Sequence, residues 1–360
     1  MNKPTTKKIC IVVSSLGGGG AEKSSAILSE LLFDMGFDIH IVSVLDQIDY
    51  PYRGKLLNLG KLKSADDSTL GRFKRLKVFR NYLRQHNFDF VIDNRTRVGL
   101  LKELVISKWV YKPKDTLYCV RSYKTDNYIN SNRFFARFLY GSANKIITVS
   151  NGILDKLKTE YGFNNLKVIY NPIDTVNETH LDKDKKEEQY ILFYGRLNDS
   201  VKNISLLLDG YSKSKLSQLN VKLKIIGNGV DEEFLKKKAK NFKSHVEFLD
   251  FQPDPIPYVK AAQFTVLTSK YEGFPRVLIE SLAAGTPVVS VDCKSGPDEI
   301  IENEYNGLLV ENNNSEALAN AMNRMFDDKD LFLQCEANAK RSVEKFSRTA
   351  IGSVWKSILN

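Results

Sequence analysis

The sequence predicts an α/β protein of two domains, each built on a doubly wound parallel sheet with helices on both faces. Short β-branched runs alternate with helix-length segments, which is the pattern of a parallel sheet covered by helices. This alternation occurs twice along 360 residues, which is enough chain for two hydrophobic cores. A hydrophobic content of 42% and a charged content of 27% are ordinary for a globular protein.

The strands of the first domain are expected where β-branched and aromatic residues cluster. These runs cover residues 8–15, 38–44, 88–93, 145–150 and 167–171. The segment AEKSSAILSELLFDMG has the length of a helix and ends at Gly36, a residue suited to a helix exit.

A second set of strands is expected further along the chain. Its members cover residues 190–196, 222–227, 246–250, 264–269 and 286–291, and the segment DEEFLKKKAKNF is a helix candidate. Between the two sets, residues 171–189 combine a proline with a charge cluster and predict an interdomain linker. The DKD at 182–184 has the form of a metal-binding DxD, but it lies in this solvated charge run, so we assign it to the linker.

The net charge of +10 is unevenly distributed. Residues 1–180 hold 28 Lys and Arg against 17 Asp and Glu, whereas residues 181–360 hold 25 against 26. Within residues 51–150 the count is 21 against 7. A basic excess confined to one half indicates an anionic surface facing that half.

Cysteine usage and hydropathy exclude several classes of protein. The four cysteines form no CxxC pair, which argues against a zinc site or a disulfide framework and favours a reducing cytosol. The apolar run near the N-terminus is too short for a secretory signal. No stretch approaches the ~20 apolar residues of a membrane-spanning helix.

The glycine-rich stretch SLGGGGAEKSS, residues 15–25, follows the first predicted strand. A P-loop and a dinucleotide fingerprint each require glycine at position 22, where this chain has Glu22. Glycines that open a helix still allow backbone amides to approach an anion. The alternative is a flexible surface turn.

A second candidate site lies in SKYEGFPRVLIESLAAGTPVVSVDCKSGPDEII, residues 269–301. Glu272 follows a predicted strand, and Glu280 lies near the start of the next predicted helix, whose first turn suits Pro275 and whose exit suits Gly285. Ligands bind at this edge of open parallel sheets. Two carboxylates suit the hydroxyls of a sugar and a ribose, although acids on a helix surface are the commoner explanation of this spacing.

Taken with other segments, this block resembles the E-x7-E signature of family 4 glycosyltransferases, which are retaining nucleotide-sugar enzymes of the GT-B fold. The resemblance covers nearly the whole chain. It rests on the order and spacing of GGGGAEK, SNGILDKL, VIYNPID, YGRLNDSVKN, IIGNG, FLDF, the E-x7-E block and its GTPVV and SGPDEII tail. It implies two Rossmann-like domains facing across a cleft that holds the donor.

The resemblance also implies roles for individual residues. Arg196 and Lys202 would bind the donor pyrophosphate and stabilise the charge of the leaving group; for Arg196 the alternative is a surface ion pair. Glu272 would contact the donor sugar, with Ser295 as a less certain partner, and Glu280 would bind the ribose. The remaining donor contacts would come from Gly18, Gly19 and Gly20, from the backbone at Gly273 and Phe274, and from a nucleobase pocket at Gly227, Gly229, Leu249 and Phe251, for which ordinary strand-end turns are the alternative.

The chain departs from the family in one place. Many relatives have a histidine near the sugar where this chain reads LYCVRSYKTDN, so Arg121 takes that position, with Asp126 nearby. Arginine stays protonated and cannot act as a general base, so Arg121 is a candidate for binding the sugar or an acidic acceptor. None of the four histidines lies in a matched motif, and no metal or other cofactor is expected.

Residues 70–84 alternate apolar and basic side chains at helical spacing, which suits a helix on anionic lipid headgroups. The alternative is a helix whose apolar stripe faces its own core, and for the similar segment at 133–141 that alternative is preferred. No nucleic-acid-binding motif occurs.

We therefore expect a retaining glycosyltransferase. It would transfer a hexose or N-acetylhexosamine from a nucleotide sugar, a UDP-sugar by preference, to a glycan or lipid-linked glycan in the synthesis of a bacterial surface polysaccharide such as lipopolysaccharide, O-antigen or capsule. The expected location is cytoplasmic, on the inner face of the membrane. Expected domains are residues 1–172, 173–342 and a returning C-terminal helix within 343–360. The alternatives are a sugar-nucleotide epimerase, a phosphorylase or a non-catalytic nucleotide-sugar-binding partner.

Overall fold

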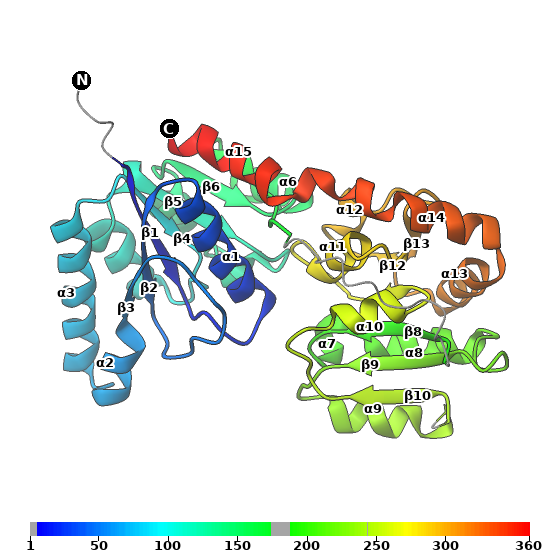
Figure 1. The fold of residues 1–360 in the computed structure, drawn as a ribbon. Helices are drawn as coiled ribbons and strands as arrows, with labels where there is room; N and C mark the ends of the chain where they lie inside the picture. The colour runs from blue at the N-terminus through cyan, green and yellow to red at the C-terminus, as the bar shows by residue number, and fades with distance from the viewer. Residues whose placement is uncertain (1–5, 174–187, 243) are drawn as a thin grey trace. The chain divides into compact units, whose positions relative to one another are not determined.

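The computed structural model describes residues 6–173, 188–242 and 244–360 (Figure 1). The chain divides into two compact units. The first unit comprises Met1–Pro172 and Arg348–Asn360, and the second comprises Ile173–Ser347. The central part of the expected linker, including the DKD, lies outside the described residues. The expected C-terminal segment 343–360 is divided between the units, because residues 343–347 belong to the second.

The first unit is a parallel sheet of seven strands in the order β3-β2-β1-β4-β5-β6-β7. Its strands are β1 (Lys8–Val13), β2 (Asp38–Ser43), β3 (Lys55–Asn58), β4 (Phe90–Asp93), β5 (Thr116–Val120), β6 (Lys145–Thr148) and β7 (Leu166–Val168). The helices are α1 (Gly20–Asp34), α2 (Leu59–Ala65), α3 (Thr69–His86), α4 (Leu100–Val105), η1 (Ile106–Val110), η2 (Pro113–Asp115), η3 (Thr125–Asn127), α5 (Arg133–Tyr140), α6 (Asn151–Tyr161) and α15 (Arg348–Leu359).

The second unit is a parallel sheet of six strands in the order β10-β9-β8-β11-β12-β13. Its strands are β8 (Tyr190–Tyr194), β9 (Lys222–Ile226), β10 (Val246–Leu249), β11 (Thr265–Leu267), β12 (Val288–Asp292) and β13 (Gly307–Glu311). The helices are α7 (Asp199–Lys202), α8 (Ile204–Lys213), α9 (Glu232–Lys238), η5 (Ala239–Phe242), α10 (Ile256–Ala261), α11 (Arg276–Ala283), α12 (Pro297–Ile300), α13 (Ser315–Asp327), α14 (Lys329–Ser342) and η6 (Glu344–Phe346).

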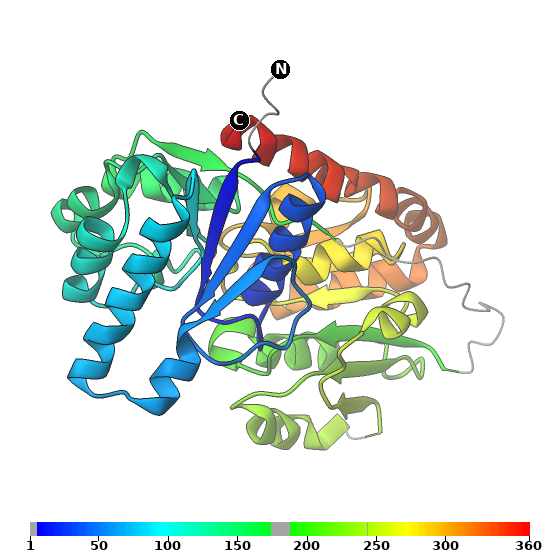
Figure 2. The same ribbon diagram turned by 60° about the vertical axis from the view of Figure 1, so that its left-hand side comes forward.

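Burial on both faces explains why the strands are almost uniformly apolar. Along β8, Tyr190, Leu192 and Tyr194 pack into a cluster on one face of the sheet, whereas Ile191 and Phe193 pack into the larger core on the other face. Side chains alternate between faces along a strand, so a strand covered on both sides carries no polar face. The predicted α/β architecture is confirmed (Figure 2).

Helix α15 packs against the first unit, although it comes last in the chain. Ile351, Trp355 and Leu359 are each at most 3% exposed and belong to the core built on β1 and α1. At its start, Arg348 Nη2 donates to Glu30 Oε2 of α1 at 2.7 Å. Part of the hydrophobic core of the first unit is therefore supplied by the end of the chain.

Candidate functional site

The strand order of the second unit defines where a ligand is expected. Strand β8 lies between β9 and β11. The chain runs from β8 to β9 and β10 on one side and then crosses to β11 on the other side, so the strand order reverses at β8. Open sheets bind ligands outside the carboxyl ends of the strands at such a point. Most of the predicted donor residues of this unit follow these strand ends: Arg196 and Lys202 after β8, Gly227 and Gly229 after β9, Leu249 and Phe251 at β10, and Glu272, Gly273 and Phe274 after β11.

Lys202 and Glu272 are in direct contact. Lys202 Nζ lies 2.6 Å from Glu272 Oε1, and the two side chains are only 21% and 13% exposed. Ser269 Oγ donates to the same oxygen at 2.6 Å, while Thr268 Oγ1 donates to the carbonyl of Lys202 at 3.0 Å. Helix α7, which carries Lys202, is thus fixed against the loop after β11.

Arg196 lies in the tight turn between β8 and α7. Its side chain is exposed, and its carbonyl accepts from the amide of Asn198 at 2.9 Å. The neighbouring Leu197 amide donates to the carbonyl of Asn228 at 3.0 Å, which joins this turn to the one after β9. The structure therefore places Arg196 at the same sheet edge as Lys202.

Glu280 is held by two residues that the sequence analysis did not assign. Arg276 Nη2 donates to Glu280 Oε1 at 2.8 Å, and the hydroxyl of Tyr194 lies 3.4 Å from Glu280 Oε2. Burial, followed by the nearby Glu280 carboxylate, raises the pKa of Tyr194 well above its ordinary value. The i, i+4 spacing of Arg276 and Glu280 was the sequence signal for this pair.

The turn at Gly273 and Phe274 contributes backbone to the site. Ser295 Oγ donates to the carbonyl of Gly273 at 2.9 Å, which places Ser295 beside this turn. The ring of Phe274 is 5% exposed and packs edge-on against Phe346 at 5.0 Å. Because that ring points into the core, only the backbone of Phe274 can serve the role expected of it.

The two expected nucleobase turns are joined by hydrogen bonds. The Gly227 amide donates to the carbonyl of Leu249 at 2.9 Å, and the Phe251 amide donates to Asn228 Oδ1 at 2.6 Å. Gly227 has φ +142°, and a Cβ there would lie 2.0 Å from the carbonyl oxygen of Gly195. Phe251 is 61% exposed, so its ring is open to a ligand.

The glycine loop of the first unit leads into α1. Gly18 has φ +84°, Gly19 is the N-cap and the helix begins at Gly20. The loop 47–49 lies against these glycines, since a Cβ on Gly17 would lie 2.1 Å from Asp49 Oδ2. A side chain at Gly17 would collide with this loop, and a left-handed φ at Gly18 is sterically open to glycine.

Arg121 follows β5 and is half-buried. Its Nη1 donates to Asn171 Oδ1 at 3.0 Å, and its Nε lies 3.4 Å from Asn94 Oδ1. Asp126 is exposed within η3 and forms no ion pair with Arg121 in the described part of the chain. In the structure the partners of Arg121 are thus two carboxamides, and not the acidic residue that is nearby in the sequence.

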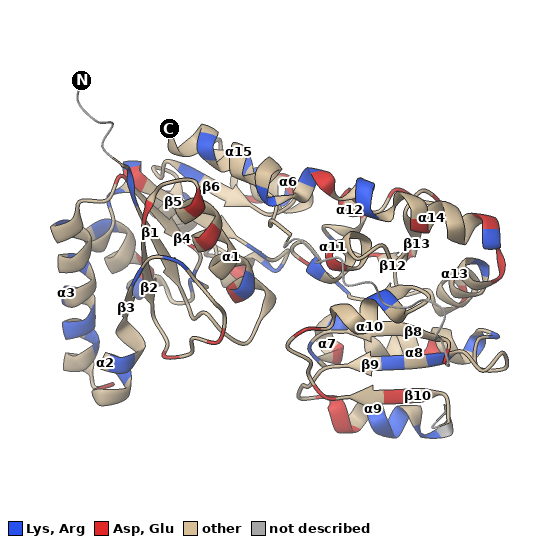
Figure 3. Cartoon of the chain, viewed as in Figure 1, with Lys and Arg blue, Asp and Glu red and all other residues tan. Residues whose placement is uncertain are grey.

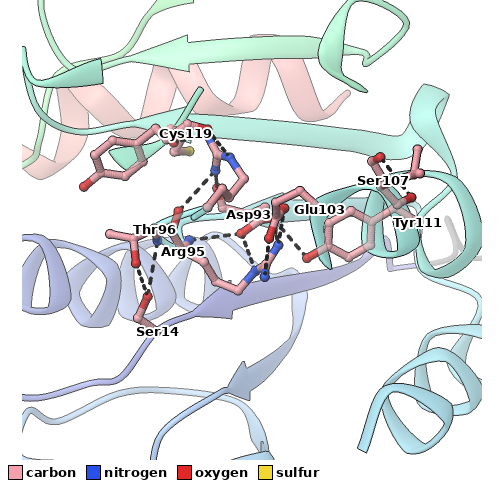
Figure 4. A network of polar contacts seen from close by, with 11 residues as sticks. Ser14, Asp93, Arg95, Thr96, Glu103, Ser107, Tyr111 and Cys119 are labelled. Atoms are coloured by element: carbon pink, nitrogen blue, oxygen red, sulfur yellow. Dashed lines mark hydrogen bonds and ion pairs between the residues drawn. The ribbon is translucent and has the colours of Figure 1, made fainter. Parts of the chain in front are cut away.

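A buried ionic network after β4 was missed from the sequence (Figure 4). Arg95 donates to both carboxylate oxygens of Asp93, at 3.0 and 2.7 Å, and to Glu103 at 3.3 Å. These three side chains are at most 3% exposed. Burial alone would raise the pKa of Asp93, but Arg95 and Arg97 outweigh it and hold that pKa below its ordinary value.

Arg97 extends this network to the neighbouring loops. Its guanidinium donates to the carbonyls of Tyr128 at 2.8 Å, Cys119 at 2.9 Å, Asp93 at 3.1 Å and Arg95 at 3.2 Å. The sequence signal was NRTR, two arginines directly after a predicted buried strand. Through the carbonyls of Cys119 and Tyr128, the network holds the chain on both sides of Arg121 in sequence.

Two further features of the described residues bear on the remaining expectations. Across residues 6–173, 188–242 and 244–360, no group of three or more His, Cys, Asp or Glu side chains is arranged to hold a metal ion. No helix of the same residues is long and apolar enough to span a bilayer. The independence of the reaction from metals stays a prediction.

Comparison with known proteins identifies the class. The model of the group 1 glycosyl transferases matches residues 177–342, and that of glycosyltransferase family 4 matches residues 18–177. These two matches cover most of the chain, and a curated glycosyltransferase is 30% identical over 96% of it, so the chain belongs to the glycosyltransferases that the two models describe and is an enzyme of that class. Its fold is GT-B, with one Rossmann-like parallel sheet in each unit.

Three similar proteins are informative. The first is the N-acetylgalactosamine-N,N'-diacetylbacillosaminyl-diphospho-undecaprenol 4-alpha-N-acetylgalactosaminyltransferase of Campylobacter jejuni, 30% identical over 96% of this chain and 97% of that protein. The amylovoran biosynthesis glycosyltransferase AmsD of Erwinia amylovora is 24% identical over 98% of this chain and 99% of its own length. A crystal structure of Staphylococcus aureus TarM with fondaparinux, alpha-GlcNAc-glycerol and UDP superposes with a TM-score of 0.79 at 16% identity, covering 99% and 100% of the two chains.

Proposed function

We propose that the protein is a retaining, metal-independent glycosyltransferase. It transfers a hexose or N-acetylhexosamine from a UDP-sugar to a glycan or lipid-linked glycan during the synthesis of a bacterial surface polysaccharide. The observation that carries this proposal is the pair formed by Lys202 and Glu272 at the carboxyl edge of the second sheet. The names of two relatives support it, since they act on a polyprenyl diphosphate-linked saccharide and in the synthesis of amylovoran.

The pair suits a reaction in which a diphosphate leaves. A lysine ammonium has three donors, and Lys202 gives one to Glu272, so two remain for phosphate oxygens. Arg196, exposed in the adjoining turn, adds a permanent cation. As the glycosidic bond breaks, negative charge grows on the departing phosphate, and fixed cations stabilise it more in the transition state than in the ground state.

The carboxylates of this edge suit hydroxyl groups. Glu272 Oε1 already accepts from Lys202 and Ser269, so Oε2 remains the better acceptor for a sugar hydroxyl. Glu280 is oriented by its ion pair with Arg276 at 2.8 Å, and its carboxylate would accept from the hydroxyls of a ribose. A carboxylate that is already oriented loses little entropy when it binds a ligand.

Donor binding tests this assignment. A thermal-shift screen of nucleotide sugars should identify the donor, because a ligand at about 100 times its dissociation constant adds ~2.7 kcal/mol of stability. Glu280→Ala should weaken UDP binding by about tenfold, the effect of losing one hydrogen bond to a charged group. Glu299→Ala, on the short helix α12, is the matched control. Unchanged UDP affinity in Glu280→Ala would refute the ribose role.

We propose further that the protein meets its lipid-linked acceptor at an anionic membrane surface. Helix α3, the α4–η1 segment and helix α5 form one exposed surface of the first unit, which we call the basic-aromatic surface. Figure 3 shows Lys and Arg along α3. The exposed large apolar side chains of the basic-aromatic surface are Leu70 (71%), Phe73 (59%), Val78 (39%), Leu101 (78%), Val105 (38%), Trp109 (37%), Phe134 (74%), Phe135 (39%) and Phe138 (52%).

Contacts between these elements make the basic-aromatic surface continuous. Phe73 stacks on Trp109 with centroids 6.3 Å apart, and Arg80 lies 4.3 Å from the centre of the same indole. Lys108 Nζ lies 4.4 Å from the Phe138 ring and donates to its backbone carbonyl at 2.6 Å. Exposed aromatic rings among cations match the chemistry of a bilayer interface with anionic headgroups.

The expectations for the apolar residues of helices α5 and α3 are each met only in part. In α5, Ala136, Leu139 and Tyr140 face the core as expected, but the three phenylalanines of that helix are exposed. In α3, Phe79 and Leu83 are buried while Leu70 and Phe73 are not. The apolar residues of each helix therefore cover two faces, of which one packs inward.

Vesicle binding tests the membrane assignment. The protein should sediment with vesicles that contain phosphatidylglycerol and not with neutral phosphatidylcholine, and high salt should release it. Reversing Arg72, Lys74 and Lys77 to Glu should abolish sedimentation, since each cation near such a surface contributes about 1 kcal/mol. Phe234→Ser, an exposed ring of the second unit, should have no effect. Equal sedimentation of the reversed variant would refute the assignment.

A further inference from the structure

Three arginines of the first unit lie near the ends of β4 and β5, and they differ in how far they are paired. Arg95 is bound by Asp93 and Glu103, and Arg97 donates to four carbonyls. Arg121 has only the two carboxamide oxygens of Asn94 and Asn171. A guanidinium has five N–H donors, so three donors of Arg121 have no protein acceptor in the described residues.

Among the described residues the charge of Arg121 also has no counterion. No carboxylate of the described chain lies within 4.0 Å of it, although the side chain is half-buried. Nη2 is the nitrogen of Arg121 that has no hydrogen bond to the described residues, and it is not among the buried unsatisfied atoms, so it reaches solvent. A partly desolvated cation without a counterion attracts an anion strongly, because screening by water is reduced.

Two buried carboxamides hold this cation in position. Asn94 is 7% exposed and Asn171 is 8% exposed. Asn94 Nδ2 donates to Ser25 Oγ of α1 at 3.1 Å, which turns Asn94 Oδ1 toward Arg121. Neutral acceptors orient a guanidinium without neutralising it, whereas a carboxylate at either position would form an ion pair.

The space beside Arg121 shows which side a ligand can occupy. A cavity of about 10 Å³ is lined by Arg121, Asn171, Ser24, Cys119 and Trp355, among others. A water molecule already requires ~10–15 Å³ of such volume, so this inner space holds no sugar or phosphate. A ligand must therefore meet Arg121 from the solvent side, where its unpaired N–H groups lie.

We propose that Arg121, oriented by Asn94 and Asn171, binds a phosphate group of a diphosphate substrate. This inference rests on the proposed function, under which two diphosphates reach the enzyme: that of the nucleotide donor and that of a lipid-linked acceptor. Phosphate oxygens match the planar fork of arginine, and the bond is charge-assisted. Arg121 is then a binding residue, and Asn94 and Asn171 are positioning residues.

Two titrations distinguish the source of the phosphate. The first adds UDP to the full-length protein, and the second adds inorganic pyrophosphate to protein saturated with UDP. Arg121→Gln should weaken binding at least about tenfold in one of them, because it removes a hydrogen bond between charged groups. Loss in the first assigns Arg121 to the donor, and loss in the second assigns it to the acceptor.

The decisive variant is Asn171→Asp. It preserves the shape and the acceptor oxygen, and within the described residues Asn171 Nδ2 donates no hydrogen bond that would be lost. The new carboxylate should neutralise Arg121 and reproduce the loss seen in Arg121→Gln, with a melting temperature equal to or above that of the wild type. Arg121→Lys should restore part of the affinity. Asn132→Asp at the N-cap of α5 and Arg341→Gln on α14 carry the same charge changes and should bind as the wild type does.

The outcomes separate this inference from the proposed function. If the wild type binds no UDP, the proposed donor is wrong, and the pyrophosphate titration of the unliganded protein then tests Arg121 by itself. If the wild type binds UDP and Arg121→Gln matches it in both titrations, the inference is overturned. Wild-type affinity in Asn171→Asp overturns it as well, because a purely structural arginine would tolerate a stronger partner.

Discussion

Replacing Arg97 with methionine should destabilise the first unit severely. The substitution keeps most of the apolar stem and removes a guanidinium that is 3% exposed and bonded to four carbonyls. It leaves the carbonyls of Cys119 and Tyr128 without their donor and takes one cation from the neighbourhood of Asp93. Removing one partner from a buried ionic arrangement costs about 3–5 kcal/mol.

The two tryptophans provide an assay confined to this unit. Trp109 and Trp355 are the only tryptophans of the chain, and both belong to the first unit. Their fluorescence therefore follows urea unfolding of that unit separately, which matters because a two-domain chain need not unfold in one step. With a slope of about 2 kcal/mol per molar urea, a loss of 3–5 kcal/mol lowers the midpoint by about 1.5–2.5 M.

Two comparisons make this prediction refutable. Arg133→Met removes an exposed arginine from α5 of the same unit and should move the midpoint by less than about 0.3 M, since exposed substitutions change stability by about 0.5 kcal/mol or less. Arg97→Lys keeps the charge but loses the fork, and should lie between the two. A midpoint for Arg97→Met within 0.5 M of the wild type, roughly 1 kcal/mol, would show that the network contributes little.

Two further predictions follow from the geometry. Gly227→Ala should destabilise the second unit by about 2–4 kcal/mol and weaken UDP binding, because it adds a clash with the Gly195 carbonyl to a strained φ. Calorimetry should show a smaller loss of stability for Gly195→Ala, whose Cβ would meet nothing closer than 4.0 Å. Equal losses in the two variants would refute the role of the clash. His40 should make the first unit less stable in acid. Burial is the largest cause that lowers the pKa of His40 from the ordinary 6.5. The titratable groups that face His40 are Asp38, His86, Lys55 and Tyr82. The unfolded chain then binds a proton that the folded protein does not, so stability is full above about pH 6.5 and falls by up to about 1.4 kcal/mol per pH unit below it. Tryptophan-detected urea midpoints at about pH 7.5 and pH 5.5 should differ less in His40→Gln than in the wild type, and an unchanged difference would refute the assignment.

The sequence predicts the architecture better than it predicts its edges. Buried strands such as β1 and β8 are recognised by their apolar runs, because both faces of a parallel sheet are covered. Strand β3 was missed because it is a half-exposed edge strand of four residues. Strand β5, TLYCV, is wholly buried, but its mixed composition does not give an apolar run, and it was not predicted. Strand β13 was not predicted either, because it begins with glycine and ends with glutamate.

The sequence predicted individual residues of the candidate site but not the contacts between them. Lys202 and Glu272 were each named for a ligand, but their contact depends on how α7 packs on the loop after β11, and no local pattern encodes that packing. For Arg121, the sequence indicated only that Asp126 is nearby in the chain. The structure gives it Asn94 and Asn171 instead, since tertiary contacts join strand ends that are distant in the chain.

Helix α15 has a consequence for how the molecule is made. The first unit cannot bury Leu31 and its neighbours with Trp355 until the whole second unit has been translated. Until then the early sheet leaves uncovered the apolar side chains that α15 buries. A truncation that removes Arg348–Leu359 would therefore uncover part of the core of the first unit, although the deleted helix directly follows the second unit.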